Sequence, residues 1–108
     1  MIDLSILRNL MGNDEKMVQQ FLHIFKTQTP EQLNQLDNFI SNKDWESASA
    51  IAHAIKSQSK YLGLEEIANQ AFTIEKNTEK KENLPDIQNK FNVLKKLTNT
   101  ILADPVFI

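Results

Sequence analysis

The chain of 108 residues contains no cysteine, only two glycines and three prolines, and a single arginine. The absence of cysteine excludes disulfides and thiolate metal sites. Two scattered glycines cannot build a glycine-rich phosphate loop, so a nucleotide-binding site is not expected. No apolar stretch approaches the ~20 residues that a membrane span needs, and the N-terminus does not resemble a signal peptide. We therefore expect a cytoplasmic protein without a membrane-spanning segment.

The charges and the two histidines argue against several further classes of protein. Twelve basic and fourteen acidic residues leave a formal net charge of -2. With one arginine, this balance argues against a nucleic-acid-binding surface. His23 and His53 are far apart in the chain, whereas a metal site needs three or four converging ligands. A hydrolytic triad needs a pocket, which an exposed histidine on a helix does not offer. We expect neither a metal site nor an enzyme with its own catalytic centre.

The spacing of apolar residues predicts an all-α fold in one domain, residues 1–108. A chain of this length can fold without disulfides, and its few turn-forming residues imply long helices with short connections. We predict a short helix capped by Asp3 and ending near Leu10, a long helix over about 15–40 bent at Pro30, and helices over about 45–62, 64–78 and 84–103. Together they favour an antiparallel up-and-down four-helix bundle, with the short N-terminal helix capping one end.

Each long segment has an apolar side that we expect to be buried. Its members are Met17, Val18, Phe21, Ile24, Phe25, Leu33, Leu36, Phe39 and Ile40 in the first long segment, Ala48, Ile51, Ala52, Ile55, Ser59 and Leu62 in the second, Leu64, Ile67, Ala68, Ala71, Phe72, Ile74 and Glu75 in the third, and Ile87, Phe91, Val93, Leu94, Leu97, Ile101 and Leu102 in the last.

His53 is the best candidate for a reactive side chain. On a wheel of about 100° per residue it points roughly 150° away from the apolar side of its helix, into solvent. Lys56, Ser57 and Lys60 lie on the neighbouring turns of the same side. The pattern predicts an exposed imidazole with lysines nearby, open to the surface of another protein, and the small residues Ala50 and Ala54 flank it.

An exposed histidine beside a lysine suits the transfer of a phosphoryl group. Imidazole is nucleophilic near neutral pH because much of it is unprotonated there. The incoming group brings a charge of about -1.5 to -2, and a lysine one turn away offsets part of it. Lys56 is therefore the expected supporting residue. Considered alone, however, a histidine on a surface helix is usually only a solvated side chain.

The residues around His53 resemble the signature of histidine-containing phosphotransfer (HPt) domains. In that signature a histidine is followed by lysine at the third position, a small residue at the fourth, and Leu-Gly at the ninth and tenth, which correspond here to Lys56, Ser57, Leu62 and Gly63. Glycine is common where Ser57 stands. The resemblance extends over about residues 14–78, through Phe21, Pro30, Leu33, Leu36, Asp44, Trp45, Ala48, Ala52, Ile74 and Glu75.

The resemblance implies a five-helix fold in which His53 accepts phosphate on Nε2 and Lys56 supports the charge. It also implies no cofactor in this chain, because Mg²⁺ and the catalytic carboxylates of the transfer belong to a receiver domain. The expected partners are the receiver domains of a hybrid sensor kinase and of a response regulator, bound by a monomer. Their expected docking surface comprises Ala50, Ala54, Ser57, Lys60 and Gly63.

Two other functions were weighed against phosphotransfer. The dimerisation helix of a sensor kinase also carries a phosphorylated histidine, but an acidic residue typically follows it and a proline comes later. Ala54 follows His53, and the first proline after His53 is Pro85, which disfavours that function. A helical adaptor that docks a receiver or another signalling partner without accepting phosphate remains the alternative.

Overall fold

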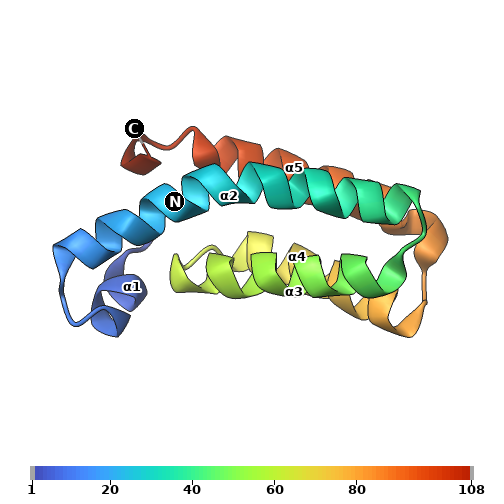
Figure 1. Cartoon of the computed structure of the whole chain (residues 1–108), viewed down its shortest axis with the longest axis horizontal. Coiled ribbons are helices and arrows are strands. Elements are labelled where there is room, and N and C mark those ends of the chain that lie inside the picture. The colour runs from blue at the N-terminus through green and yellow to red at the C-terminus, as the bar shows by residue number, and fades with distance from the viewer. Residues whose placement is uncertain (1, 108) are drawn as a thin grey trace.

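Four long helices run alternately up and down in the structure, a computed structural model that describes residues 2–107 (Figure 1). The helices are α1 (Ser5–Leu10), α2 (Glu15–Ser41), α3 (Trp45–Tyr61), α4 (Glu65–Lys80) and α5 (Ile87–Leu102), with short 3-10 turns at η1 (Leu84–Asp86) and η2 (Pro105–Phe107). Residues 2–107 contain no strand. The predicted all-α, antiparallel four-helix bundle is confirmed.

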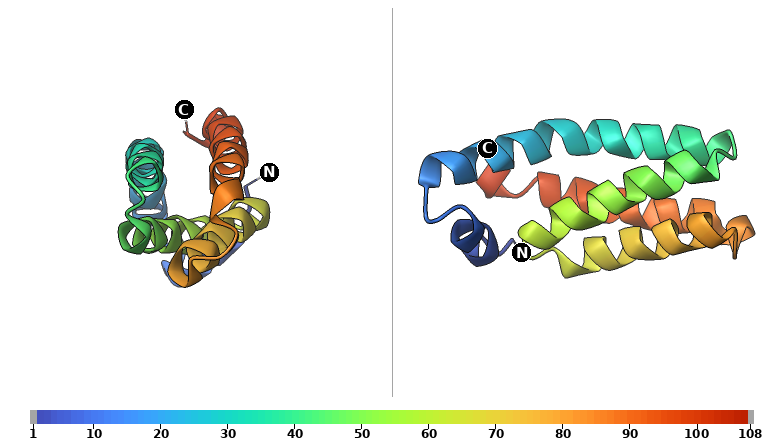
Figure 2. Two further views of the ribbon diagram at one scale, coloured as in Figure 1. Left: turned by 90° about the vertical axis from the view of Figure 1, so that its right-hand side faces the viewer. Right: turned by 60° about the horizontal axis from the view of Figure 1, so that its bottom comes forward.

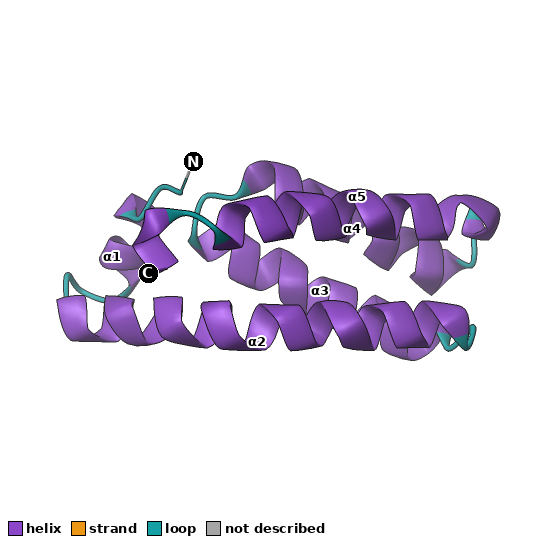
Figure 3. Ribbon diagram, turned by 90° about the horizontal axis from the view of Figure 1, so that it is seen from above, coloured by secondary structure: helices purple, strands orange, loops and turns teal. Residues whose placement is uncertain are grey.

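The long helices occupy the four corners of the bundle, so that α3 lies diagonally opposite α5 (Figure 2). Helices α3 and α4 pack together most extensively, and α2 packs against α3 and α5. Seen from above, α2 runs along one side and α4 with α5 along the other (Figure 3). One face of α3 is thus left open between its two neighbours.

Side-chain caps start two of the long helices. The carboxylate of Asp14 accepts hydrogen bonds from the backbone N–H groups of Lys16 and Met17 at the start of α2. The carboxylate of Asp44 accepts a hydrogen bond of 3.2 Å from the backbone N–H of Ser47 in α3. These bonds satisfy N–H groups that have no partner within the helix.

Pro30 lies inside α2, which is one continuous helix as predicted. Proline lacks the N–H that would bond to the preceding turn, and its ring crowds that turn. Figure 1 shows the first half of α2 rising and the second half running level. The helix thereby stays in contact with its neighbours along the bundle.

Helix α1 covers one end of the bundle, as predicted, and this is the end where α3 passes into α4. The Asp3 carboxylate accepts a hydrogen bond of 2.9 Å from the N–H of Ser5. The N–H of Asp3 donates to the carbonyl oxygen of Leu62 at 3.1 Å. Leu7 is fully buried, so α1 contributes one large side chain to the core.

One hydrophobic core runs through the bundle. Its fully buried members include Leu7, Val18, Leu36, Ala48, Ala52, Leu62, Ala71, Ile74 and Leu94. The predicted burial was wrong for Met17, Ile24, Phe72 and Val93, which are exposed. Each lies more than about 100° from the middle of the stripe that its helix buries, too far round to reach the core.

The end of α4 and the segment after α5 differ from what the sequence predicted. Helix α4 continues to Lys80, two residues beyond the predicted end, and Lys81 follows in the left-handed conformation. After α5, the ring of Phe107 is buried and stacks on Phe25, with 5.6 Å between their centroids.

Within residues 2–107, no helix combines the length and apolar character needed to cross a bilayer.

Candidate functional site

His53 lies near the middle of α3 on the face that points out of the bundle. The core side of α3 is formed by Ala48, Ala52, Ile55 and Ser59, all buried. The side chain of His53 points about 130° away from the middle of that side, and it is 58% exposed. The predicted exposure of His53 is confirmed.

Glu75 of α4 joins His53 to Lys56. Its Oε2 lies 2.8 Å from Nδ1 of His53, and its Oε1 accepts a hydrogen bond of 2.8 Å from Nζ of Lys56. The hydroxyl of Ser49 donates to the carbonyl oxygen of Glu75 at 3.3 Å. Ser49, His53 and Lys56 are spaced four and three residues apart, so one face of α3 holds a single residue of α4.

The contact with Glu75 selects one tautomer of His53. An ionised carboxylate can only accept hydrogen bonds, so Nδ1 carries the proton in the contact. In the neutral imidazole, the other ring nitrogen, Nε2, then carries the free lone pair. The carboxylate also orients the ring. The site therefore presents an exposed side chain whose nucleophilic nitrogen is Nε2.

Glu75 is ionised despite its burial. Its side chain is only 9% exposed, and burial raises the pKa of the carboxyl group. Hydrogen bonds from Lys56 and His53, together with the positive charge of these groups, outweigh burial and hold the pKa of Glu75 below its ordinary value of 4.5. A full negative charge is thus available beside the ring at neutral pH.

Lys56 is much less accessible than the sequence suggested. Its side chain is 14% exposed, and its ammonium group also lies 5.2 Å from the centre of the Phe72 ring. Lys56 turns toward α4 because a buried carboxylate and an aromatic face are both available there. The ammonium group and the imidazole are separated only by the width of the Glu75 carboxylate and two hydrogen bonds.

Glu75 was absent from the predicted site residues, although the sequence contained a signal for it. The residue follows the apolar pattern of its helix, and its neighbours Ala71, Ile74 and Thr78 are buried. An acidic side chain in such a stripe needs a cationic partner. Which cation it meets depends on how α4 is aligned against α3, and the sequence alone does not specify that alignment.

The remaining predicted residues lie around His53 with different degrees of access. Ala50 and Lys60 are exposed, while Ala54 and Ser57 are partly exposed. Because Ala50, Ala54 and Ser57 are small, the outer face of α3 has little side-chain bulk beside the imidazole.

Gly63 has a structural role at the end of α3. It adopts a φ of +69°, and an added Cβ would lie 3.0 Å from the Cβ of Asp3. Glycine therefore permits both the left-handed turn after α3 and the close approach of the N-terminal segment. Any contribution of Gly63 to docking would come in addition to this role.

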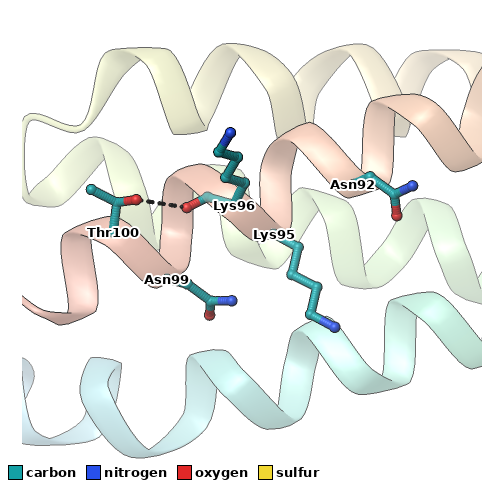
Figure 4. A pocket seen from close by; sticks show the side chains of 5 residues that line it. All are labelled: Asn92, Lys95, Lys96, Asn99 and Thr100. Atoms are coloured by element: carbon teal, nitrogen blue, oxygen red, sulfur yellow. Dashed lines mark hydrogen bonds between the residues drawn. The ribbon is translucent and has the colours of Figure 1, made fainter.

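Among residues 2–107, the other hollows on the surface lack a comparable group of side chains. The hollow in Figure 4 is lined by polar side chains of α5 alone. Within it, the hydroxyl of Thr100 donates a hydrogen bond of 3.0 Å to the carbonyl oxygen of Lys96. Helix α5 lies diagonally across the bundle from α3, the helix that carries His53 (Figure 2). The second histidine, His23, is exposed on α2 near Lys26 and Phe107. The described contacts place no carboxylate on its ring.

Replacing Lys56 with alanine should slow phosphoryl transfer to His53 about ten- to a hundredfold, on the order of 1.4 to 3 kcal/mol in the barrier. The buried Glu75 would lose its ammonium partner, so we also expect a loss of about 1–3 kcal/mol in the free energy of unfolding. The effect would be smaller if Lys56 lay in solvent, as the helical wheel placed it, because exposed side chains contribute little to stability. Rapid-quench transfer assays and urea unfolding measure the two effects.

Lys56→Met is the matched control, because it keeps an apolar stem of similar length and removes the ammonium group that binds Glu75. It should slow transfer as much as Lys56→Ala does. If both variants lose stability while transfer stays at the wild-type rate, Lys56 serves only as the counter-ion of Glu75.

Comparison with known proteins identifies a family model that matches the chain. No curated protein and no solved structure matches the chain. The family model described as "Hpt domain" matches residues 20–104, a range that contains His53, Lys56 and Glu75 and most of the four-helix bundle. The match covers well over half of the 108 residues, and the chain therefore belongs to the Hpt domain family, whose members carry out histidine phosphotransfer in two-component signalling.

Proposed function

We propose that this protein is an intermediate of a phosphorelay, in which His53 accepts a phosphoryl group from the aspartate of one receiver domain and passes it to the aspartate of another. The observation that carries the proposal is the contact between Nδ1 of His53 and the buried carboxylate of Glu75, at 2.8 Å. It leaves Nε2 as the nucleophile on a side chain that a partner can reach.

The transfer forms one bond and breaks one. The lone pair of Nε2 attacks the phosphorus of the partner's aspartyl phosphate, the bond between phosphorus and the carboxylate oxygen breaks, and the electron pair stays on the aspartate. The ring becomes a phosphorylated imidazolium that keeps its proton on Nδ1. Glu75 stabilises this cation, because its negative charge is already in place when the positive charge develops. The reverse reaction delivers the phosphoryl group to the next aspartate.

In this proposal the protein is a carrier that provides the acceptor and its immediate electrostatic environment. Lys56 offsets part of the phosphoryl charge, and its bond to Glu75 keeps it close to the ring. The receiver supplies the Mg²⁺ and the carboxylates that bind it. The carrier acts as a cytoplasmic monomer with no nucleotide or metal site of its own.

Phosphate transfer from a receiver tests the proposal. A panel of purified receiver domains is phosphorylated with radiolabelled acetyl phosphate, freed of donor, and mixed with the protein. We expect labelled protein whose phosphate is lost in acid and kept in base, as a phosphoramidate bond requires. Mass spectrometry should place the phosphate on His53.

The alternative is an adaptor that docks a receiver without accepting phosphate. An adaptor would bind one or more receivers in the same panel and gain no label, and that result would contradict the phosphorelay proposal.

A further inference from the structure

Phe72 is an aromatic side chain of α4 that lies outside the core of the bundle. It is 44% exposed, whereas the same helix buries Ile67, Ala68, Ala71 and Ile74. The apolar side of α4 is therefore complete without Phe72. Its ring contacts charged side chains instead.

The ammonium group of Lys56 lies over the ring of Phe72, with 5.2 Å between Nζ and the ring centre. The face of an aromatic ring attracts a cation within about 6 Å, because the electron distribution of the ring makes its face negative. The attraction is stronger where water is partly excluded, and the side chain of Lys56 is only 14% exposed. The ring therefore both covers the ammonium group and attracts it.

Phe72 and Glu75 hold the same ammonium group from neighbouring turns of α4. The two residues are three positions apart, so they lie on one face of the helix. Oε1 of Glu75 accepts a hydrogen bond of 2.8 Å from Nζ of Lys56, while Oε2 lies 2.8 Å from Nδ1 of His53. Lysine carries its charge on a flexible stem of four carbons. Two contacts on that charge restrict its position more than the carboxylate alone would.

We propose that Phe72 is a positioning residue for phosphoryl transfer, which acts by holding the ammonium group of Lys56 on Glu75, beside His53. This inference rests on the proposed function, because it takes Lys56 to offset the charge of the incoming phosphoryl group. Without the ring, the stem of Lys56 is free to carry its charge into solvent. A charge that is already in place lowers the barrier more than one that must be brought there during the reaction.

Lys76 provides a matched control at the same ring. Its Nζ lies 5.5 Å from the ring centre of Phe72, which is close to the distance for Lys56. Lys76, however, belongs to α4 itself, and its ion pair is with Glu79, at 3.4 Å. We therefore expect Lys76→Met to transfer phosphate at the wild-type rate.

The test replaces the ring and measures single-turnover transfer at a saturating concentration of phosphorylated receiver. Phe72→Leu keeps an apolar side chain and removes the aromatic face. We expect it to slow transfer about three- to tenfold, which is less than the effect of Lys56→Ala, because Glu75 still binds the ammonium group. Phe72→Tyr keeps an aromatic face and should stay within about twofold of the wild-type rate.

A double-mutant cycle shows whether the ring acts through Lys56. In the Lys56→Met background, Phe72→Leu should have no further effect on the rate, because the interaction that it removes is already lost. NMR detects the contact without any transfer reaction. The ring of Phe72 should shift the ε-methylene protons of Lys56 upfield in the wild type and in Phe72→Tyr, and this shift should disappear in Phe72→Leu.

Several results would overturn the inference and leave the proposed function intact. They are an unchanged rate in Phe72→Leu, the same slowing by Phe72→Leu with and without Lys56, and ε-methylene protons of Lys56 that are unshifted in the wild type. An effect of Phe72→Leu on KM alone, or an equal slowing by Lys76→Met, would also overturn it, because the ring would then act on the receiver or through Lys76. Failure of the wild type to accept phosphate from any receiver would overturn both.

Discussion

His53→Gln is expected to abolish phosphate acceptance from every receiver in the panel. Glutamine offers no nucleophilic nitrogen, so no bond to phosphorus can form. The side chain is 58% exposed and buries little apolar surface, so we expect the melting temperature to change only slightly. Its amide can still donate a hydrogen bond to Glu75, which limits the cost of losing the imidazole. Gel autoradiography and thermal unfolding measure the two quantities.

His23→Gln is the internal control for this result. His23 is also exposed on a helix, and a lysine also follows it by three residues, but it lacks the small residue, the Leu-Gly pair and the carboxylate partner that accompany His53. It should keep full acceptance. Label remaining on His53→Gln, or lost in His23→Gln, would mean that the acceptor is a different residue.

The position of His53 could be predicted because it depends on a single helix. The buried side of α3 follows from the spacing of Ala48, Ala52 and Ile55, and this side fixes the direction of every other side chain on the helix. The caps and connections were also local features, such as Asp44 before α3 and Pro30 within α2. Local signals of this kind yielded the four helices and their alternating directions.

The partners of His53 could not be predicted because they depend on contacts between helices. Glu75 reaches His53 and Lys56 only through the particular alignment of α4 on α3. The same alignment buries most of Lys56, which a single helical wheel placed in solvent. Likewise, Ile24 and Phe72 belong to apolar patterns, and only the assembled bundle shows that they lie too far from the core to be covered.

Glu75→Ala should have the second largest effect on transfer. Without the carboxylate, the imidazole of His53 is free to rotate and to adopt either tautomer, and the developing imidazolium loses its counter-charge. In enzymes, misplacing a reacting group and losing a preorganised charge each lower the reaction rate about a hundredfold. We therefore expect transfer to slow by about a hundredfold or more, which corresponds to about 2.7 kcal/mol in the activation barrier. Single-turnover transfer from a phosphorylated receiver measures this rate.

Glu75→Gln separates the hydrogen bond from the charge. Its amide oxygen can still accept a hydrogen bond from Nδ1 of His53, so transfer should be faster than in Glu75→Ala but slower than in wild type.

The charge of Glu75 also predicts how the stability of the protein changes in acid. Because the folded pKa of Glu75 lies below its ordinary value of 4.5, ionisation stabilises the wild type above that pH, and this stabilisation is lost as the pH falls through the folded pKa. The stability difference between wild type and Glu75→Gln should therefore be present at pH 6 to 7, by about 1–3 kcal/mol, and shrink well below pH 4.5. A difference that persists unchanged in acid, or equal transfer rates in wild type and Glu75→Ala, would show that the carboxylate charge does not act on His53 as we propose.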